Sequence, residues 1–131
     1  MLSNQKVRNT KEQLAHLQGL GCQVPFSSFH IYEDGEVTNC CYSWMPKLVG
    51  NITKTSLLEM YRGGVQKEIQ ESVTNGSFKF CDCTLCPSLS TQVSQGATIA
   101  PLVPLDKVRD EKTIKIYLNR SEEHTSELQS H

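Results

Sequence analysis

Six cysteines constrain this chain more than any other feature of its sequence. They fall into two distant groups, which are Cys22 with the adjacent pair Cys40 and Cys41, and a tight set in the run FKFCDCTLCP, namely Cys81, Cys83 and Cys86. Thiolates gathered from two separate parts of a small domain are a common way to hold iron or zinc. The segment from Cys22 to Cys86 is therefore predicted to fold as a cage for an inorganic centre.

The chain has 131 residues, of which 37% are hydrophobic, so it has room for one modest globular domain. Apolar residues are concentrated between Cys22 and Cys86, whereas the last third of the chain is rich in Ser, Thr, Gln and charged residues. We expect a folded unit of about 70 to 90 residues, a size at which a bound metal contributes to folding.

The N-terminal run MLSNQKVRNTKEQ is polar, and no apolar run is long enough to cross a bilayer. The sequence therefore predicts a cytoplasmic protein with no membrane partner. In a reducing compartment six cysteines are more often metal ligands than disulfides, which disfavours a secreted disulfide-bonded domain. The net charge of −1, without a basic stripe, argues against a nucleic-acid partner.

The pattern of apolar and turn residues predicts a small α+β fold. Residues 1–21 are expected to form an N-terminal helix with Thr10 and Gln13 as a capping box. A β-hairpin follows, because two β-prone runs meet at Asp34-Gly35. Cys22 precedes the first strand of this hairpin and Cys40 ends the second, so both thiols are expected at one end of the ribbon.

Two short helices are predicted after the hairpin, followed by a cysteine-rich metal-binding loop. The first helix starts at a capping box formed by Ser56 and Glu59, and the second ends at Asn75-Gly76. Trp44, Met45 and Pro46 are expected to cover the cage. The helical residues expected to face the interior are Leu57, Leu58, Tyr61, Val65, Ile69 and Val73.

The C-terminal part is predicted to lie outside this domain. Residues 91–112 are interpreted as a linker, and residues 113–119 as a β-strand that has no partner in the chain and begins a second, truncated domain. Residues 120–131, RSEEHTSELQSH, resemble the translation of a common sequencing adapter. We therefore exclude them from arguments about fold and function.

Four thiolates can hold a 4Fe-4S cluster, a tetrahedral zinc ion or, more rarely, a 2Fe-2S centre. Cys83 and Cys86 form a CxxC, a short chelate loop that both metals use, so this motif alone does not choose between them. A zinc-binding structural or interaction module remains the alternative. His30 lies on the first predicted strand, where a histidine is more often satisfied by a neighbour than bound to a metal.

The segment from Cys22 to Leu89 resembles a SPASM domain, the auxiliary iron–sulfur module of radical S-adenosylmethionine enzymes. The motifs that carry the resemblance are C-x12-G-x4-C at Cys22, Gly35 and Cys40, the word DGEVTNCC, the pair Gly50-Asn51 and the run GSFKFCDCTLCP. The resemblance gives a domain over residues 22–90.

In this family's pattern, Cys22, Cys40, Cys81 and Cys86 would ligate a 4Fe-4S cluster, and Gly35 would form the hairpin turn. Cys83 would be a spare thiol or would replace Cys81. Cys41 would neighbour the cluster without binding it, because adjacent residues on a strand point to opposite faces.

The resemblance also implies a parent enzyme. Residues 113–119 resemble the first strand of a radical S-adenosylmethionine barrel, and the CxxxCxxC motif of that barrel is absent from this sequence. The fragment is therefore expected to contain no catalytic residue and to catalyse nothing alone. In the intact enzyme the partners would be the missing C-terminal barrel, S-adenosylmethionine and a peptide or small-molecule substrate, and the auxiliary cluster would transfer electrons or position the substrate.

Overall fold

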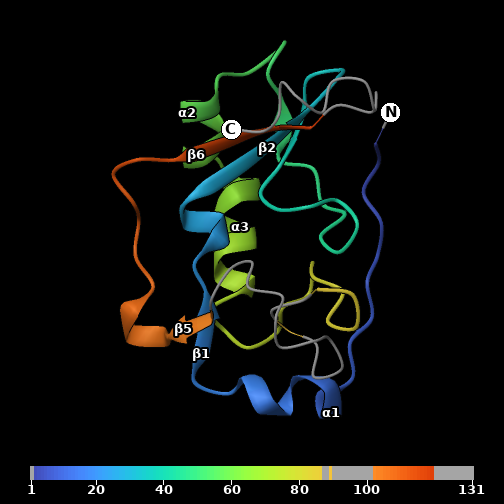
Figure 1. Cartoon of the computed structure of the whole chain (residues 1–131), viewed down its shortest axis with the longest axis vertical. Coiled ribbons are helices and arrows are strands. Elements are labelled where there is room, and N and C mark those ends of the chain that lie inside the picture. Colours follow the sequence, from blue (N-terminus) through green and yellow to red (C-terminus); the bar gives the residue numbers. More distant parts are fainter. Residues whose placement is uncertain (1, 87–88, 90–101, 120–131) are drawn as a thin grey trace, which may run out of the picture.

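The computed structural model describes residues 2–86, 89 and 102–119, and it confirms a small α+β fold. A four-stranded sheet lies at one end of the molecule, a two-stranded sheet lies near the other, and helix α3 runs between them (Figure 1). The helices are α1 Lys11–Leu14, α2 Leu57–Arg62 and α3 Gly64–Ser72, with 3-10 turns at Ala15–Leu17, Val24–Phe26 and Leu105–Lys107. The strands are β1 Leu20–Cys22, β2 Ser28–Tyr32, β3 Glu36–Thr38, β4 Gly50–Asn51, β5 Leu102–Pro104 and β6 Lys115–Asn119.

The N-terminal helix is much shorter than residues 1–21. Its capping box is confirmed, because the Thr10 hydroxyl accepts from the backbone N–H of Gln13 and the Gln13 side chain accepts from the N–H of Thr10. Residues before Thr10 instead bond to distant parts of the chain: Gln5 N–H donates to the Pro46 carbonyl at 3.0 Å, and Asn4 Oδ1 accepts from Leu48 N–H at 2.7 Å. These long-range bonds compete with a helix and hold the segment extended.

The hairpin is confirmed. Strands β2 and β3 are antiparallel, with Ile31 opposite Val37, and Gly35 takes a φ of 91° in the turn, which favours glycine. Asn51 braces this turn by donating from Nδ2 to the Asp34 carbonyl at 3.3 Å. The Gly-Asn pair of the sequence therefore supports the hairpin turn from β4, the strand that pairs with β3.

The C-terminal strand does have a partner, so the prediction of an unpaired strand is wrong. Strand β6 pairs in parallel with β2, with Phe29 opposite Ile116. Strand β5 and a 3-10 turn occupy part of the predicted linker, and β5 pairs with β1, with Cys22 opposite Leu102. Strand β5 thus provides hydrogen-bond partners for backbone groups of β1, and β6 does so for the edge of β2. The remainder of the linker at 91–101, and residues 120–131, lie outside the described residues.

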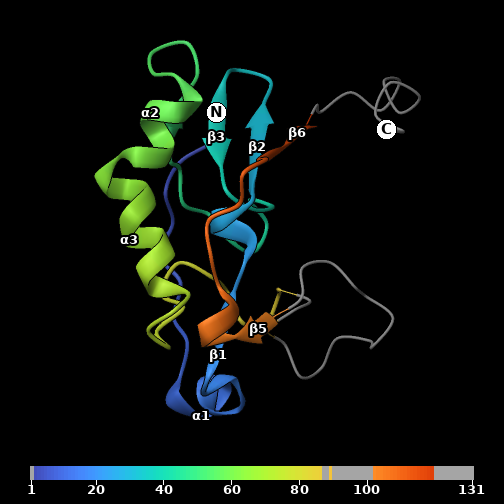
Figure 2. The same ribbon diagram turned by 90° about the vertical axis from the view of Figure 1, so that its left-hand side faces the viewer.

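Two hydrophobic clusters form the interior. We call the first the sheet core; its buried residues are Phe29, Val37 and Met60, and it lies between the four-stranded sheet and α2. We call the second the cysteine core, and its buried residues are Leu17, Met45, Ile69, Val73, Phe78, Cys81, Cys83 and Leu89. Figure 2 shows α2 and α3 following one another along one side of the strands.

Two of the residues expected to face the interior do not. Leu58 is 58% exposed and Val65 is 40% exposed, whereas Met60 and Gln66 are buried. Short helices bury a narrow stripe, and Gln66 belongs to it because its Nε2 donates to the Pro25 carbonyl at 2.7 Å. Within the part of the chain that is described, no helix has the length and apolar character to cross a membrane.

Candidate metal centre

Five of the six cysteines meet at the cysteine core. Cys81 and Cys83 are buried in it, and Cys22, Cys40 and Cys86 pack against it. These residues arrive from three places: the end of β1, the segment after β3, and the loop after α3. The structure therefore brings both cysteine groups of the sequence to one region.

Strand β1, not the hairpin, delivers Cys22. The Cys22 N–H donates to the carbonyl of Val73 at 3.2 Å, which ties β1 to the end of α3. Gly21 allows this close approach, because a Cβ there would lie 2.8 Å from Cγ2 of Val108 and 3.1 Å from the Val73 carbonyl oxygen. Cys22 was expected at the entry of the hairpin; the structure places it in a separate strand, and the 3-10 turn Val24–Phe26 lies between it and β2.

The electrostatics of the thiols shows that they share one environment. Burial, with smaller contributions from the charges of Cys40 and Cys86, raises the pKa of the Cys22 thiol to about 12. Burial also raises the pKa of Cys81 well above its ordinary value, with added contributions from Cys22, Cys86, Cys40 and Cys83. Thiolates in this apolar region are costly unless a positive charge compensates them, and a bound metal centre supplies that charge. The donor set therefore fits a metal centre.

Hydrogen-bond donors reach two of the sulfurs. The indole Nε1–H of Trp44 donates to Sγ of Cys40 at 3.2 Å, and a backbone bond from Cys41 also lowers the pKa of Cys40 against the dominant effect of burial. A backbone bond from Val24 acts in the same way on Cys22. Donors to ligand sulfurs are among the features that adjust iron–sulfur centres.

Trp44 also connects the two cysteine groups. Its carbonyl accepts from the N–H of Asp82 at 2.7 Å, while its indole bonds to Cys40. Asp82 in turn shapes the second group, because its carbonyl accepts from Cys86 N–H at 2.9 Å and its carboxylate accepts from Thr84 N–H at 3.0 Å. The expectation that the Trp44 segment covers the site is consistent with this double contact, and Met45 beside it is buried in the cysteine core.

The two cysteines outside the predicted ligand set, Cys83 and Cys41, lie in different environments. Cys83 is 3% exposed and sits in the cysteine core beside Cys81. Cys41 is half-buried outside that core, where its charge acts on Cys40 and Tyr32.

His30 lies on β2 and is satisfied by neighbours, as expected. Its Nδ1 is 2.9 Å from Nδ2 of Asn119, and its ring stacks on Tyr117 with centroids 4.8 Å apart. Both neighbours belong to β6, the strand beside β2.

The thiols are close enough to shift one another's pKa, but their side chains do not converge on one position. In residues 2–86, 89 and 102–119, no three His, Cys, Asp or Glu side chains converge to hold a metal ion. The choice of Cys22, Cys40, Cys81 and Cys86 as ligands therefore stays a prediction.

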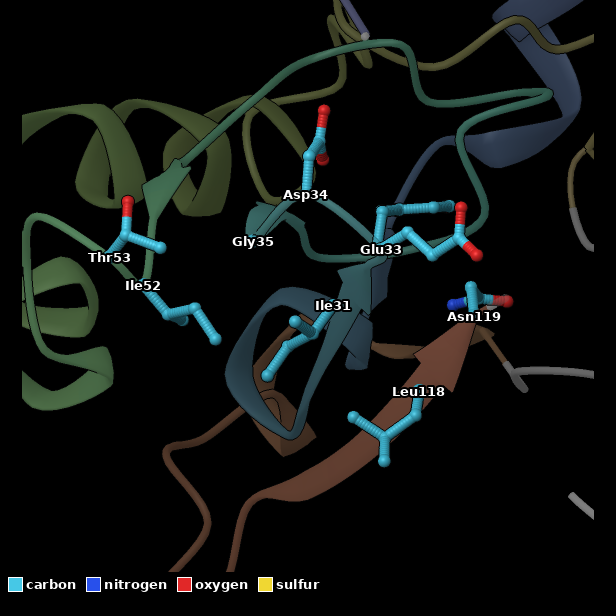
Figure 3. Close-up of a pocket in the computed structure, with 9 residues that line it drawn as sticks. Ile31, Glu33, Asp34, Gly35, Ile52, Thr53, Leu118 and Asn119 are labelled. Carbon is cyan, nitrogen blue, oxygen red and sulfur yellow. The ribbon is translucent and has the colours of Figure 1, made fainter. Parts of the chain in front are cut away.

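An open hollow of about 430 Å³ lies at the turn end of the hairpin. Figure 3 shows Ile31 of β2, Ile52 after β4 and Leu118 of β6 around it, with Glu33 and Asp34 of the hairpin turn nearby. No cysteine lines this hollow, so it is separate from the candidate centre.

Comparison with known protein families matches residues 22–87, half of the 131-residue chain, to SPASM, an iron–sulfur cluster-binding domain. The chain belongs to the SPASM family. The matched region of this SPASM domain begins at Cys22 and includes all six cysteines. Searches of curated proteins and of solved structures gave no match.

The sequence placed Trp44 over the SPASM cysteine site but did not predict its bond to Cys40, for which their four-residue separation was the available signal. Asn9, which bonds to the backbone of the Cys81 loop, gives no signal, because it lies in a polar segment about 70 residues from its partners.

Proposed function

We propose that this SPASM domain holds a 4Fe-4S cluster through Cys22, Cys40, Cys81 and Cys86. The observation that carries the proposal is that Cys22, Cys40 and Cys86 pack against the apolar core that buries Cys81, and that all three thiols raise the pKa of Cys81. The family match supports iron over the zinc alternative. Cys83 is the spare thiol and Cys41 is a neighbour of the cluster.

The residues around the thiols would give the cluster a dry, hydrogen-bonded site. Burial by Met45, Ile69 and Phe78 limits access of water, and the indole of Trp44 holds the Cys40 sulfur. Such surroundings set the reduction potential of an iron–sulfur centre. When bound, the cluster supplies one-electron chemistry. Four cysteine ligands leave no iron open, which favours electron transfer or a structural role over direct binding of substrate.

We infer that the domain serves a radical S-adenosylmethionine enzyme of the cytoplasm. The catalytic barrel, its CxxxCxxC motif, S-adenosylmethionine and the peptide or small-molecule substrate would belong to the rest of that enzyme. This part of the proposal rests on the family resemblance and on the motifs of residues 22–89. The domain would contribute a one-electron centre and would not itself carry out the reaction.

Anaerobic purification with iron, sulfide and zinc analysis tests the proposal. We expect a brown protein with broad visible absorption and about four irons and four sulfides per chain. Cys22→Ala should lose the cluster, whereas Cys83→Ala should keep it, and both variants remove one thiol beside the same core. A colourless protein that holds one zinc ion would favour the zinc module. Equal iron in the two variants would contradict the ligand assignment.

A further inference from the structure

The segment before the family match supplies one side chain to the cysteine loop. Asn9 Nδ2 donates to the carbonyl oxygens of Phe78 at 3.1 Å and Cys81 at 2.8 Å. Its Oδ1 accepts from the backbone N–H of Cys83 at 3.2 Å. The single side-chain amide of Asn9 thus donates two hydrogen bonds to the loop and accepts one from it.

The loop that Asn9 holds begins at a strained residue. Phe78 is fully buried and has a φ of 43°, a left-handed conformation that is unfavourable for a bulky side chain. Such a conformation persists only when its surroundings determine it in several ways. The Phe78 N–H donates to the Ser72 carbonyl at 2.8 Å, and the Phe78 carbonyl accepts from Cys81 N–H at 3.0 Å and from Asn9. Asn9 is therefore one of three attachments that keep this turn in place.

Other hydrogen bonds besides those of Asn9 anchor the N-terminal segment. Leu2 N–H donates to the Glu36 carboxylate at 2.7 Å, Leu48 N–H donates to Asn4 at 2.7 Å, and Gln5 N–H donates to the Pro46 carbonyl at 3.0 Å. Figure 1 shows this segment running along the molecule from the sheet end to α1. Since other contacts also hold the segment, we expect loss of the three Asn9 bonds to affect the cysteine loop more than the N-terminal segment.

We propose that Asn9 is a positioning residue for the cluster: it holds the backbone from Phe78 to Cys83 so that the sulfur of Cys81 stays directed at the shared site. This inference rests on the proposed cluster function. It extends the functional unit beyond residues 22–87, because a residue outside the matched region sets the geometry of a ligand inside it. Without Asn9 the carbonyls of Phe78 and Cys81 and the N–H of Cys83 each lose one hydrogen bond, the Phe78 carbonyl keeps only its bond from Cys81 N–H, and the strained turn at Phe78 can relax.

The test compares Asn9→Ala, Asn9→Asp and the matched control Asn4→Ala in the anaerobically purified chain. Aspartate has nearly the same volume as asparagine but no donor hydrogens, so it separates hydrogen bonding from packing. Asn4→Ala removes a similar bond from the same segment without touching the cysteine loop. The measurements are the rate of iron release to a chelator, the electron paramagnetic resonance spectrum of the reduced cluster, and hydrogen exchange of the peptide covering residues 78–86.

For both Asn9 variants we expect iron release on the order of 10- to 100-fold faster than in the wild type, as for other residues that orient metal ligands. Their spectra should change, and exchange should quicken in residues 78–86 alone. Asn4→Ala should stay within about twofold of the wild type in iron release.

Two results would overturn the inference: unchanged release, spectrum and exchange in the Asn9 variants, or equal effects in Asn4→Ala. If the wild type binds no cluster, the proposed function fails. Hydrogen exchange then judges the Asn9 contact alone, and unchanged exchange would reject it as well.

Discussion

The sheet core and the cysteine core are built in opposite ways. The buried residues of the sheet core are Phe29, Val37 and Met60, three apolar side chains from the β2–β3 hairpin and helix α2. The cysteine core draws on residues from Leu17 to Leu89 and places two thiols in its interior. The buried residues of the first core are all apolar, whereas the second core gathers thiols that bind metal as charged thiolates. The proposed metal centre should therefore stabilise the cysteine core more than the sheet core.

The two regions also differ in how their backbone groups are hydrogen-bonded. In the β2–β3 hairpin, ladder bonds and the Gly35 turn satisfy the main chain locally. At the cysteine loop, side chains of Asn9 and Asp82 and the carbonyl of Trp44 do so from three segments. The sheet end is therefore regular, and the cysteine end depends on a few individual bonds.

Removing the iron should give the largest difference between the two cores. In the reduced protein from which a chelator has removed the iron, we expect exchange of backbone amides near Cys22 and Cys81 to rise by at least about tenfold, because the thiols become protonated and the metal–sulfur bonds that join their segments are lost. Amides of the β2–β3 pair should change little. Hydrogen exchange with mass spectrometry measures both regions at once, and uniform loss of protection would show that the cores are not independent.

Truncating one buried side chain in each core should separate them next. Met60→Ala and Ile69→Ala remove residues that are 5% and 0% exposed, and each should cost about 2–5 kcal/mol of unfolding free energy. Only Ile69→Ala should also speed the release of iron, because Ile69 lies in the cysteine core. Denaturant unfolding and chelator kinetics provide the two readouts, and faster iron release in Met60→Ala would contradict the separation.

Trp44→Phe should give a smaller effect, confined to the cysteine core. The substitution keeps an aromatic ring and the carbonyl that binds Asp82, but it removes the N–H donor to the Cys40 sulfur. Such a donor stabilises the reduced cluster, so its loss should lower the reduction potential by about 20–60 mV, the equivalent of one net hydrogen bond for one electron. A redox titration measures the shift. Met45→Leu, a similar-volume change in the same core, should leave the potential unaltered.

The smallest expected effect is a pH dependence at the sheet end. Burial lowers the pKa of His30 in the folded state, so the unfolded chain takes up its proton first as the pH falls. Stability should therefore be fully present above the ordinary imidazole pKa of about 6.5 and should decrease as the pH falls through that value. Thermal unfolding at pH 7.5 and 5.5 should show a larger decrease for the wild type than for His30→Gln. Equal decreases would exclude His30 as the cause.

Local sequence signals predicted the hairpin turn and the helix starts well. Asp34-Gly35 predicted the hairpin turn, and the Thr10–Gln13 and Ser56–Glu59 pairs predicted both capping boxes. These features depend on residues a few positions apart, so the sequence carries them directly. The pairing of β6 with β2 was missed because alternation indicates a strand but not its neighbour.

The sequence predicted which residue types form the candidate site, but it did not predict the hydrogen bonds and the turn conformation that hold the cysteine loop. Cysteine spacing indicated that two distant groups would meet, and the cysteine core contains members of both. The bonds of Asn9 to the cysteine loop span 69 to 74 positions and follow no periodic pattern. The φ of Phe78 was equally hidden, because nothing in the sequence marks a phenylalanine for a left-handed turn.

The parallel pairing of β2 with β6 also bears on the order of assembly during synthesis. Ribosomes release a chain from its N-terminus, so Cys86 and every other cysteine emerge before Lys115. Closing the long connection between β2 and β6 is entropically slow compared with forming the neighbouring hairpin. The nascent domain can thus acquire its metal while the outer edge of β2 is still open, and β6 completes the sheet afterwards.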